Sequence, residues 1–428
     1  MAVVSASVSN QVAALKELYS GDDYMQNLVY KKNPLLALIP KDESPSGFAG
    51  KYIPVPLQFG TPQGRSATFS SAQSNQTPPQ LASFFVYRVR NYQLATIDNE
   101  LLEATRDDAG SFVREAKQVM DGAIRNITND LALDLFGDGS GLRGVISSIT
   151  GGVITLADPQ TVVNMEVGMV LVSYSISGTT YTQSAGAAVG YVIGVQRSIG
   201  TVTVSATQGG AAALPSGWSA ATPNLGMQGD VAFGTLSVRT SFNKLSGLAA
   251  WFPATPAVAG ESFWGVDRSV DSRMQGTIAQ NTATETIEEA LIDAAALVAR
   301  EGGMPDMCFM SFASYAALEK SLGSKVQYID VKHDEVDISF AGIRVNAPYG
   351  PITIIPDRSC PSKTAYLLQM DTLKLRTLGK APHVLTYGDE GLQGLRVGNA
   401  DALEIRWAYY GNLICNAPVF NCVIPLSQ

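Results

Sequence analysis

The feature that most limits how this chain can fold is a long polar segment between two strand-like arms. Residues 60–80 read GTPQGRSATFSSAQSNQTPPQ, in which Phe69 is the only large apolar side chain. The flanking arms, YIPVPLQF and FFVYRV, alternate with the two-residue period of a β-strand. A segment this polar has no core of its own. We therefore expect the arms to pair as a long hairpin that carries the polar segment at its tip.

The first arm of this hairpin contains Pro54 and Pro56, which have no backbone N–H to donate to a neighbouring strand. The arm is therefore expected at a sheet edge or in a free ribbon. Arms of about 20 residues each would reach roughly 60 Å at about 3.3 Å per residue. Because an isolated two-stranded ribbon is marginally stable in water, we expect it to lie on a neighbouring subunit, with Arg65 and Phe69 as candidate anchors.

Length and composition indicate a globular protein of several packed units. The chain has 428 residues, of which 46% are hydrophobic and 16% are charged, so two or three units are expected. Its formal net charge of -8 argues against a surface that grips nucleic acid, because such a surface needs lysine and arginine. A shell that encloses DNA without binding its sequence remains compatible with this charge.

The sequence contains no apolar run of about 18 residues, and no positive charge precedes the apolar residues of its N-terminus. We therefore expect no membrane partner, no signal peptide and a protein that stays in the cytosol. The cysteines form no C-x-x-C pair and are too sparse for a disulfide framework. They are expected to be reduced and structural: Cys308, Cys360, Cys415 and Cys422.

A long helix is predicted over residues 109–136, where apolar side chains recur at three- and four-residue steps. Asp108 is its expected N-cap and Gly137 the expected residue after its C-terminus, which gives a rod of about 42 Å. A shorter helix is expected near 98–106. The N-terminal arm is compatible with a short amphipathic helix over residues 9–21.

Residues 146–234 are depleted in charge, with only Asp158, Glu166, Arg197 and Asp230 charged. Short strand-like runs such as VGMVLVSYS, GYVIGV and IGTVTVSAT alternate there with turns rich in glycine and serine. This pattern predicts an inserted small β-barrel or sandwich.

The C-terminal part mixes helical and strand-like patterns. One helix has a capping box from Thr286 to Glu289 and a stop at Gly302, and a second helix ends at Gly323. The strand-like runs around them include MCFMSF, AGIRVNA, ITIIPD, AYLLQM, LKLRTL, ALEIRWAYYGNLI and FNCVIPL. Helices grouped with antiparallel-looking strands indicate an α+β unit.

No pattern of catalytic, cofactor-binding or metal-binding residues is recognisable. His333 lies in the charge-rich DVKHDEVD, where a solvated loop is expected, and His383 in KAPHVL is expected to be structural. The glycine-rich DLFGDGSGLRG follows a helix instead of preceding one, so it is interpreted as a helix stop and not as a phosphate or calcium site. We therefore expect a protein that is not an enzyme.

The segment GVDRSVDSRMQG, residues 265–276, interleaves opposite charges. Two interpretations are open: a solvated loop with weak internal ion pairs, or a seam between subunits in which paired charges fix register. The residues concerned are Asp267, Arg268, Asp271 and Arg273.

The order of these parts resembles the major capsid proteins of tailed bacteriophages. The resemblance is carried by the order of six parts: an arm, a polar-tipped hairpin, a helix ending LFGDGSGLRG, an insertion with VGMVLVSY, the segment AAWFPATPAVAGESFWGVDRSVD and an α+β half. It implies the HK-97-like fold of icosahedral shells built from pentamers and hexamers around double-stranded DNA. The implied parts are an N-terminal arm (1–46), an extended-loop hairpin (47–96), a peripheral domain with a spine helix (97–145), a β-rich insertion (146–234), more peripheral domain (235–284), an axial domain (285–390) and returning C-terminal strands (391–428).

The resemblance also implies partners and a place in the cell. They are other copies of the chain, a separate scaffolding protein, a portal and a decoration protein, with assembly in the bacterial cytoplasm. Some relatives join neighbours covalently through a lysine of the extended loop, but this chain has no lysine between Lys51 and Val89. We therefore expect the hairpin to hold its neighbour without a covalent bond.

Two other classes of protein are weighed against the phage capsid. An encapsulin-like compartment has a similar fold, and the β-rich insertion favours the phage interpretation over it. An enzyme or carbohydrate-binding protein built around the insertion would need a convergent set of titratable residues in a pocket, and the sequence offers none that is recognisable.

Overall fold

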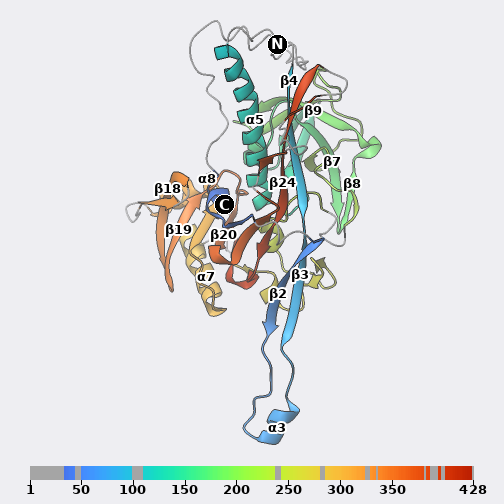
Figure 1. Cartoon of the computed structure of the whole chain (residues 1–428). Helices are drawn as coiled ribbons and strands as arrows, with labels where there is room; N and C mark the ends of the chain where they lie inside the picture. Colours follow the sequence, from blue (N-terminus) through green and yellow to red (C-terminus); the bar gives the residue numbers. More distant parts are fainter. Residues whose placement is uncertain are drawn as a thin grey trace.

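The computed structural model contains a long hairpin, a long helix, a β-barrel and a mixed sheet with helices (Figure 1). The structure describes residues 33–43, 50–98, 109–236, 242–279, 285–322, 328–333, 336–379, 382–385, 394–396 and 401–426. The expected helix at 9–21 and the N-cap Asp108 lie outside these residues, as does the helix near 98–106 apart from Asp98, which ends a strand.

The predicted hairpin is present and projects from one end of the molecule (Figure 1). Strand β2 (Tyr52–Gly60) pairs antiparallel with β3 (Gln80–Tyr87). The strands have 9 and 8 residues, so the expected arms of about 20 residues were wrong. The rest of the projection is a tip that contains a short helix, α3 (Phe69–Ser74).

The root of the hairpin belongs to the main hydrophobic core. Ile53 and Val55 of β2 and Phe84 and Val86 of β3 are buried, which matches the alternation predicted for the first arm. Their neighbours on the opposite face point away from this core and are more exposed. The hairpin is therefore held at its base by its own subunit.

A six-stranded sheet continues from the root of the hairpin through β4 (Val89–Asp98), and β24 (Ala402–Cys415) is its central strand. Strand β4 pairs along the whole first part of β24. The other strands are β1 (Lys41–Asp42), β21 (Leu373–Thr377), β22 (His383–Val384) and β23 (Gly394–Arg396). Strands β21 and β22 fall inside the range expected for the axial domain, yet they pair with β24, because the chain crosses between sheets after Leu368.

The predicted long helix is α5 (Ala109–Phe136), and it packs against β4 and β24. Ile127, Leu131 and Leu135 form its buried stripe. The backbone N–H of Gly137 donates to the carbonyls of Leu133 and Asp134, so the helix ends at the glycine-rich segment as predicted.

The charge-poor insertion forms a closed β-barrel. Strand β11 (Asn224–Met227) pairs with both β5 and β7 and thereby closes a ring of six strands. The ring also contains β5 (Leu142–Thr150), β6 (Val153–Leu156), β10 (Thr201–Ser205), β9 (Val189–Gln196) and β7 (Val170–Ser177), with β8 (Thr180–Gln183) and β12 (Gly234–Thr235) attached outside. The barrel begins at Leu142, four residues before the expected boundary, and Ile154, Val202 and Leu225 fill its separate core.

The C-terminal part is a seven-stranded mixed sheet with helices on one face. Its strands, in order, are β15 (Thr277–Ile278), β25 (Cys422–Pro425), β20 (Thr364–Leu368), β16 (Met307–Met310), β19 (Gly350–Pro356), β18 (Val336–Ala347) and β17 (Tyr328–His333). Helices α7 (Ile287–Arg300) and α8 (Phe312–Leu322) share a core with Cys308 and Met310 of β16, while Phe309 faces the main core. The expected loop around His333 is wrong, since His333 ends β17 of a β-hairpin.

The remaining elements tie the N-terminal arm and the linker to the main core. Helix α2 (Pro34–Leu38) lies against α5, and its Leu35 N–H donates to the buried carboxyl of Asp357 over 3.1 Å. Helix α6 (Leu248–Trp251) and the small pair β13 (Ser262–Phe263) and β14 (Val266–Asp267) also join this core. All four cysteines are free and buried. Within the described residues, none of the helices is both long and apolar enough to cross a lipid bilayer.

Candidate assembly surfaces

The tip of the hairpin is folded by its own local hydrogen bonds. The N–H of Thr77 donates to the Gln63 carbonyl over 3.0 Å, and the Thr68 hydroxyl donates to Ser71 over 2.8 Å at the start of α3. Both predicted anchors lie on the surface: Arg65 is exposed, and the Phe69 side chain is 85% exposed. The tip therefore presents a large apolar side chain to solvent on a preformed support.

The face of the hairpin that points away from its own core is also apolar. Tyr52, Phe85 and Leu81 are 42%, 38% and 68% exposed, and the rings of Tyr52 and Phe85 meet edge to face with 5.0 Å between centroids. The prolines Pro54 and Pro56 lie on the same face and are exposed. We call these five residues the outer face of the hairpin. From Tyr52 to Tyr87 the only charged side chain is that of Arg65, so this face has no charged residue.

The charged loop at 265–276 is divided between interior and surface. Arg268 is 3% exposed, its Nη1 donates to the Ala250 carbonyl over 2.8 Å, and its guanidinium lies 4.0 Å from the centre of the Phe263 ring. The expectation that Arg268 contacts another subunit is therefore wrong, because its charge is used inside the fold. The aliphatic part of this side chain is buried and the guanidinium packs on the Phe263 ring, and both contacts suit an arginine at this position.

The other three charged residues of this loop make local contacts. Asp271 and Arg273 form a two-pronged ion pair, with 2.7 Å between Oδ2 and Nη2, and this hydrogen bond lowers the pKa of Asp271. Asp267 accepts from Ser269 and from the Gly260 N–H, and these bonds lower the pKa of its carboxyl. These contacts agree with the loop interpretation. A role of Asp267, Asp271 and Arg273 between subunits stays a prediction.

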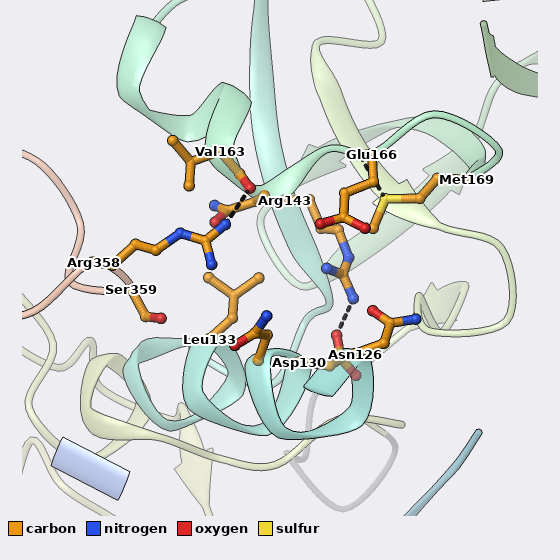
Figure 2. Close-up of a pocket in the computed structure, with 11 residues that line it drawn as sticks. Asn126, Asp130, Leu133, Arg143, Val163, Glu166, Met169, Arg358 and Ser359 are labelled. Atoms are coloured by element: carbon orange, nitrogen blue, oxygen red, sulfur yellow. Dashed lines mark hydrogen bonds and ion pairs between the residues drawn. The ribbon is translucent and has the colours of Figure 1, made fainter. Parts of the chain in front are cut away.

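A buried cluster of five charged residues joins the barrel to α5. Asp130 and Asp134 lie one turn apart on α5, Arg143 is on β5 where the chain enters the barrel, and Asp230 and Lys244 flank the exit. The Lys244 Nζ lies 2.6 Å from Asp130, 3.1 Å from Asp230 and 3.4 Å from Asp134. Arg143 pairs with Asp130, as Figure 2 shows, and its Nη2 lies 3.4 Å from Asp230. We call these residues the charge cluster.

The pKa values of the two carboxyls on α5 are shifted in opposite directions by their surroundings. Burial raises the pKa of Asp134 to about 7, although Lys244 opposes the shift. Burial also disfavours the charged form of Asp130, but the charges of Arg143 and Lys244 outweigh it and hold the pKa of Asp130 well below its usual range. Asp130 is therefore the ionised partner of the two cations, and Asp134 is the carboxyl that gains or loses a proton near neutral pH.

The charge cluster was not predicted from the sequence. One indication of it is visible there, because Asp230 is one of only four charged residues between 146 and 234. Asp130 and Asp134 also stand at helical spacing beside the apolar stripe of α5. What the sequence does not give is the meeting of residues as far apart as 130 and 244.

A cavity of about 680 Å³ lies between the barrel, the end of α5 and the loop at 358–363. Its lining combines apolar residues such as Phe136 and Leu245 with polar groups such as Ser362. Among the described residues, no group of His, Cys, Asp or Glu has an arrangement that could hold a metal ion.

The chain is similar to a chain of the cyanophage A-1(L) capsid asymmetric unit, with a TM-score of 0.54 and 13% identity over 95% of this chain and 96% of that chain. Residues 226–391 match the family model described as SU10 major capsid protein. This family match over 166 of the 428 residues, together with the capsid fold, supports a structural subunit of a tailed-phage capsid and not a catalytic protein.

The matches beyond this capsid protein are more distant. A chain from Mycobacterium phage Bobi has a TM-score of 0.40 and 9% identity over 99% of both chains. The holo-SrpI encapsulin complex from Synechococcus elongatus PCC 7942 has a TM-score of 0.42 and 9% identity, covering 97% of this chain and 94% of that chain. No curated protein matches the capsid protein in sequence.

Proposed function

We propose that copies of this capsid protein assemble as pentamers and hexamers into an icosahedral shell around double-stranded DNA, and that each hairpin clasps a neighbouring subunit. The observation that carries the proposal is the outer face of the hairpin. One face of the ribbon packs on its own core at Ile53 and Phe84, while the other is apolar, uncharged and exposed. Apolar surface on a projecting element is typical of an interaction site.

The tip gives the clasp a second contact. Phe69 and Arg65 combine a large apolar side chain with a cation, and aromatic and arginine residues are frequent anchors of protein interfaces. The hairpin contains no lysine from Tyr52 to Tyr87. The contact is therefore proposed to be non-covalent, and its strength comes from burial of apolar area.

The domain roles follow from the same proposal. The six-stranded sheet with α5 is the peripheral domain, and the seven-stranded sheet with α7 and α8 is the axial domain around the centre of a capsomer. The barrel is the insertion, placed over the peripheral domain at the outer surface. The N-terminal arm, through α2, joins the peripheral and axial parts, which the bond from Leu35 to Asp357 supports.

Further partners belong to the same proposal. A shell of this kind needs a portal for DNA entry and a scaffolding protein that guides closure, and a decoration protein would reinforce a lattice that lacks covalent links. Assembly takes place in the cytoplasm of the host bacterium. The DNA is enclosed without sequence-specific binding, in keeping with the net charge of -8.

The encapsulin alternative has less support. The family model that matches residues 226–391 is that of a phage capsid protein. The β-barrel inserted between Leu142 and Thr235 is the part that a cargo compartment does not require.

The decisive experiment expresses the chain alone and with a scaffolding protein and examines the products by negative-stain electron microscopy. Capsomers or shells are expected, and a strict monomer under both conditions would contradict the proposal. The hairpin is tested by deleting residues 62–78 and changing the remaining Thr61 and Pro79 to Asn-Gly, a two-residue turn between the paired Gly60 and Gln80. This variant should remain folded and form no closed shells. Normal shells from it would refute the clasp.

A further inference from the structure

The barrel meets the rest of the subunit at a point where the entering and leaving chain segments touch. The entering segment passes through Gly139 and Gly141, whose φ values are 91° and 77°, in the region that favours glycine. A Cβ added to Gly141 would lie 3.1 Å from the carbonyl of Asp230, on the leaving segment. The barrel has a core of its own, so its internal packing does not depend on how it is held at this point.

Apolar contacts between the barrel and the leaving segment are made by Phe242, whose ring lies 5.6 Å from that of Tyr181, and polar contacts join the barrel to α5 and to the loop at 358–363. The cavity of about 680 Å³ separates the barrel from the end of α5 and from the loop at 358–363. Besides the bond from Asn243 Nδ2 to the Gly229 carbonyl, two groups of polar contacts between described residues, which we call tethers, join the barrel to α5 and to this loop, and Figure 2 shows one bond of each. The first is the charge cluster. The second joins the loop to the 3₁₀ helix Pro159–Asn164, where Arg358 Nη2 donates to the Val163 carbonyl over 2.8 Å and Ser362 donates to Asp158.

The charge cluster does not balance when every member is ionised. Three carboxyls face two cations, so a fully ionised cluster holds one excess negative charge in a buried site, which is costly. Loss of one negative charge restores the balance. The groups in direct contact within the site are Asp130 and Asp134 from α5, Arg143 from β5, Asp230 from the exit of the barrel, Lys244 from the segment before α6, Tyr409 from β24 and Asn91 from β4. Further charged groups line the adjoining spaces, among them Glu166 of the barrel and Arg358 beside Asp130, and Asp138 and Arg358 beside Asp134.

We propose that the charge cluster is a pH-sensitive latch, which fixes the barrel on α5 while Asp134 carries a proton and releases it when Asp134 ionises. Asp134 is the member suited to this role, because its neighbours leave it the weakest compensation. Its carboxyl lies 3.4 Å from Lys244 and accepts a hydrogen bond from Tyr409 over 3.1 Å, whereas Asp130 contacts both cations directly.

The direction of the response follows from linkage. Burial raises the pKa of Asp134 from 3.8 to about 7 in the latched state, and hydration in the released state returns the pKa toward its ordinary value. The latched state therefore binds the proton more tightly and is favoured at low pH. The ratio of released to latched subunits should rise about tenfold per pH unit between about pH 4 and pH 7 and then level off. The pKa of Asp130 is held far below this window, so Asp130 stays ionised throughout it.

The test measures the distance between spin labels on the barrel and on the main body of the full-length, unassembled subunit. Cysteines introduced at exposed Ser198 and Val270 carry the labels, since the four native thiols are buried. At pH 5 we expect one narrow distance distribution. At pH 7 a second distribution should appear, with a released-to-latched ratio up to about fiftyfold higher than at pH 5, and the ratio should rise by no more than about twofold between pH 7 and pH 8.

Four aspartate-to-asparagine variants separate the explanations. Asp134→Asn should remove the pH response, and Asp130→Asn should move it below pH 5, because Asp134 and Asp230 then balance the two cations. Asp271→Asn, in the surface loop, is the matched control and should keep the full response. Asp357 lies beside the second tether, and burial raises its pKa to about 6, so Asp357→Asn tests whether that carboxyl is responsible instead.

Three results would overturn the latch. The first is a wild-type distance distribution that is the same at pH 5 and pH 8. The second is a full pH response in Asp134→Asn. The third is a response that Asp357→Asn abolishes, since this would assign it to the loop at 358–363.

Discussion

The ring of Phe84 lies edge-on to the indole of Trp251, with 5.3 Å between the ring centroids. Phe84 belongs to β3 of the hairpin, and Trp251 ends α6 and donates its Nε1–H to the Leu413 carbonyl of β24 over 3.1 Å. The contact therefore connects the projecting hairpin to the central strand of the six-stranded sheet.

Replacing Phe84 with alanine should lower the free energy of unfolding by about 3 to 5 kcal/mol, because the side chain is fully buried and leaves a cavity. Urea denaturation of the unassembled subunit measures the loss. The control is Leu81→Ala on the same strand, where the side chain is 68% exposed and the change should stay within about 0.5 kcal/mol. Equal losses for the two variants would contradict the anchoring role of Phe84.

The strands of the hairpin could be predicted from the sequence, but the helix at its tip could not. The strand period placed Ile53 and Val55 on one face, and both are buried. Helix α3 was not predicted, because its six residues have no apolar repeat and are stabilised by bonds inside the tip. Short helices of this kind depend on local hydrogen bonds more than on periodicity.

Replacing Arg143 with methionine should destabilise the subunit by about 3 to 5 kcal/mol, since it leaves buried carboxylates with one cation fewer. Thermal and urea unfolding measure the effect. Arg273→Met is the matched control, because the Arg273 side chain is 46% exposed and pairs only within its loop. If Arg143→Met unfolds like Arg273→Met, the charge cluster does not hold the barrel in place.

The charge cluster could not be predicted because it depends on which segments meet. Helix α5, the barrel strands and the C-terminal sheet were each foreseen from periodicity and turn residues, since those signals are local. The pairing of Lys244 with Asp130 spans 114 positions in sequence. It forms only because the barrel begins and ends on the same side of α5, which is a property of the topology and not of either segment.

Removing the predicted capping box of α7 should have a smaller effect. Thr286 accepts a hydrogen bond from the Glu289 N–H, and the Glu289 carboxylate accepts from the Thr286 N–H over 2.9 Å. Thr286→Ala should therefore cost about 1 kcal/mol in the free energy of unfolding, measured by urea denaturation. Thr286→Ser retains the hydroxyl and should stay near wild type. A full loss in the serine variant would show that the methyl group matters and not the cap.

The four cysteine thiols should not react with thiol reagents until the protein unfolds. Burial raises the pKa of Cys415 and of Cys422 to about 12, and it also raises the pKa of Cys308 and Cys360. At pH 8 a disulfide reagent such as Ellman's should therefore find no reactive thiol in the native subunit and four after unfolding in urea. Val270→Cys, at a site that is 68% exposed, should add one fast-reacting thiol. If one thiol of the native wild-type protein reacted quickly, one of the four cysteines would have to be exposed at the surface.

The tip of the hairpin allows folding and assembly to be separated by one substitution. The Phe69 side chain is 85% exposed, so Phe69→Ser should change the free energy of unfolding by no more than about 0.5 kcal/mol. If Phe69 anchors the clasp, its loss should weaken each contact between subunits by about 2 kcal/mol, or roughly thirtyfold. Sedimentation and electron microscopy of the assembly products should then show capsomers and few closed shells. Ile199→Ser removes an apolar side chain that is 61% exposed on the barrel, away from the hairpin, and its shells should form normally. If Phe69→Ser still forms normal shells, the contact with the neighbouring subunit is not made by the tip and must be made by the outer face of the hairpin.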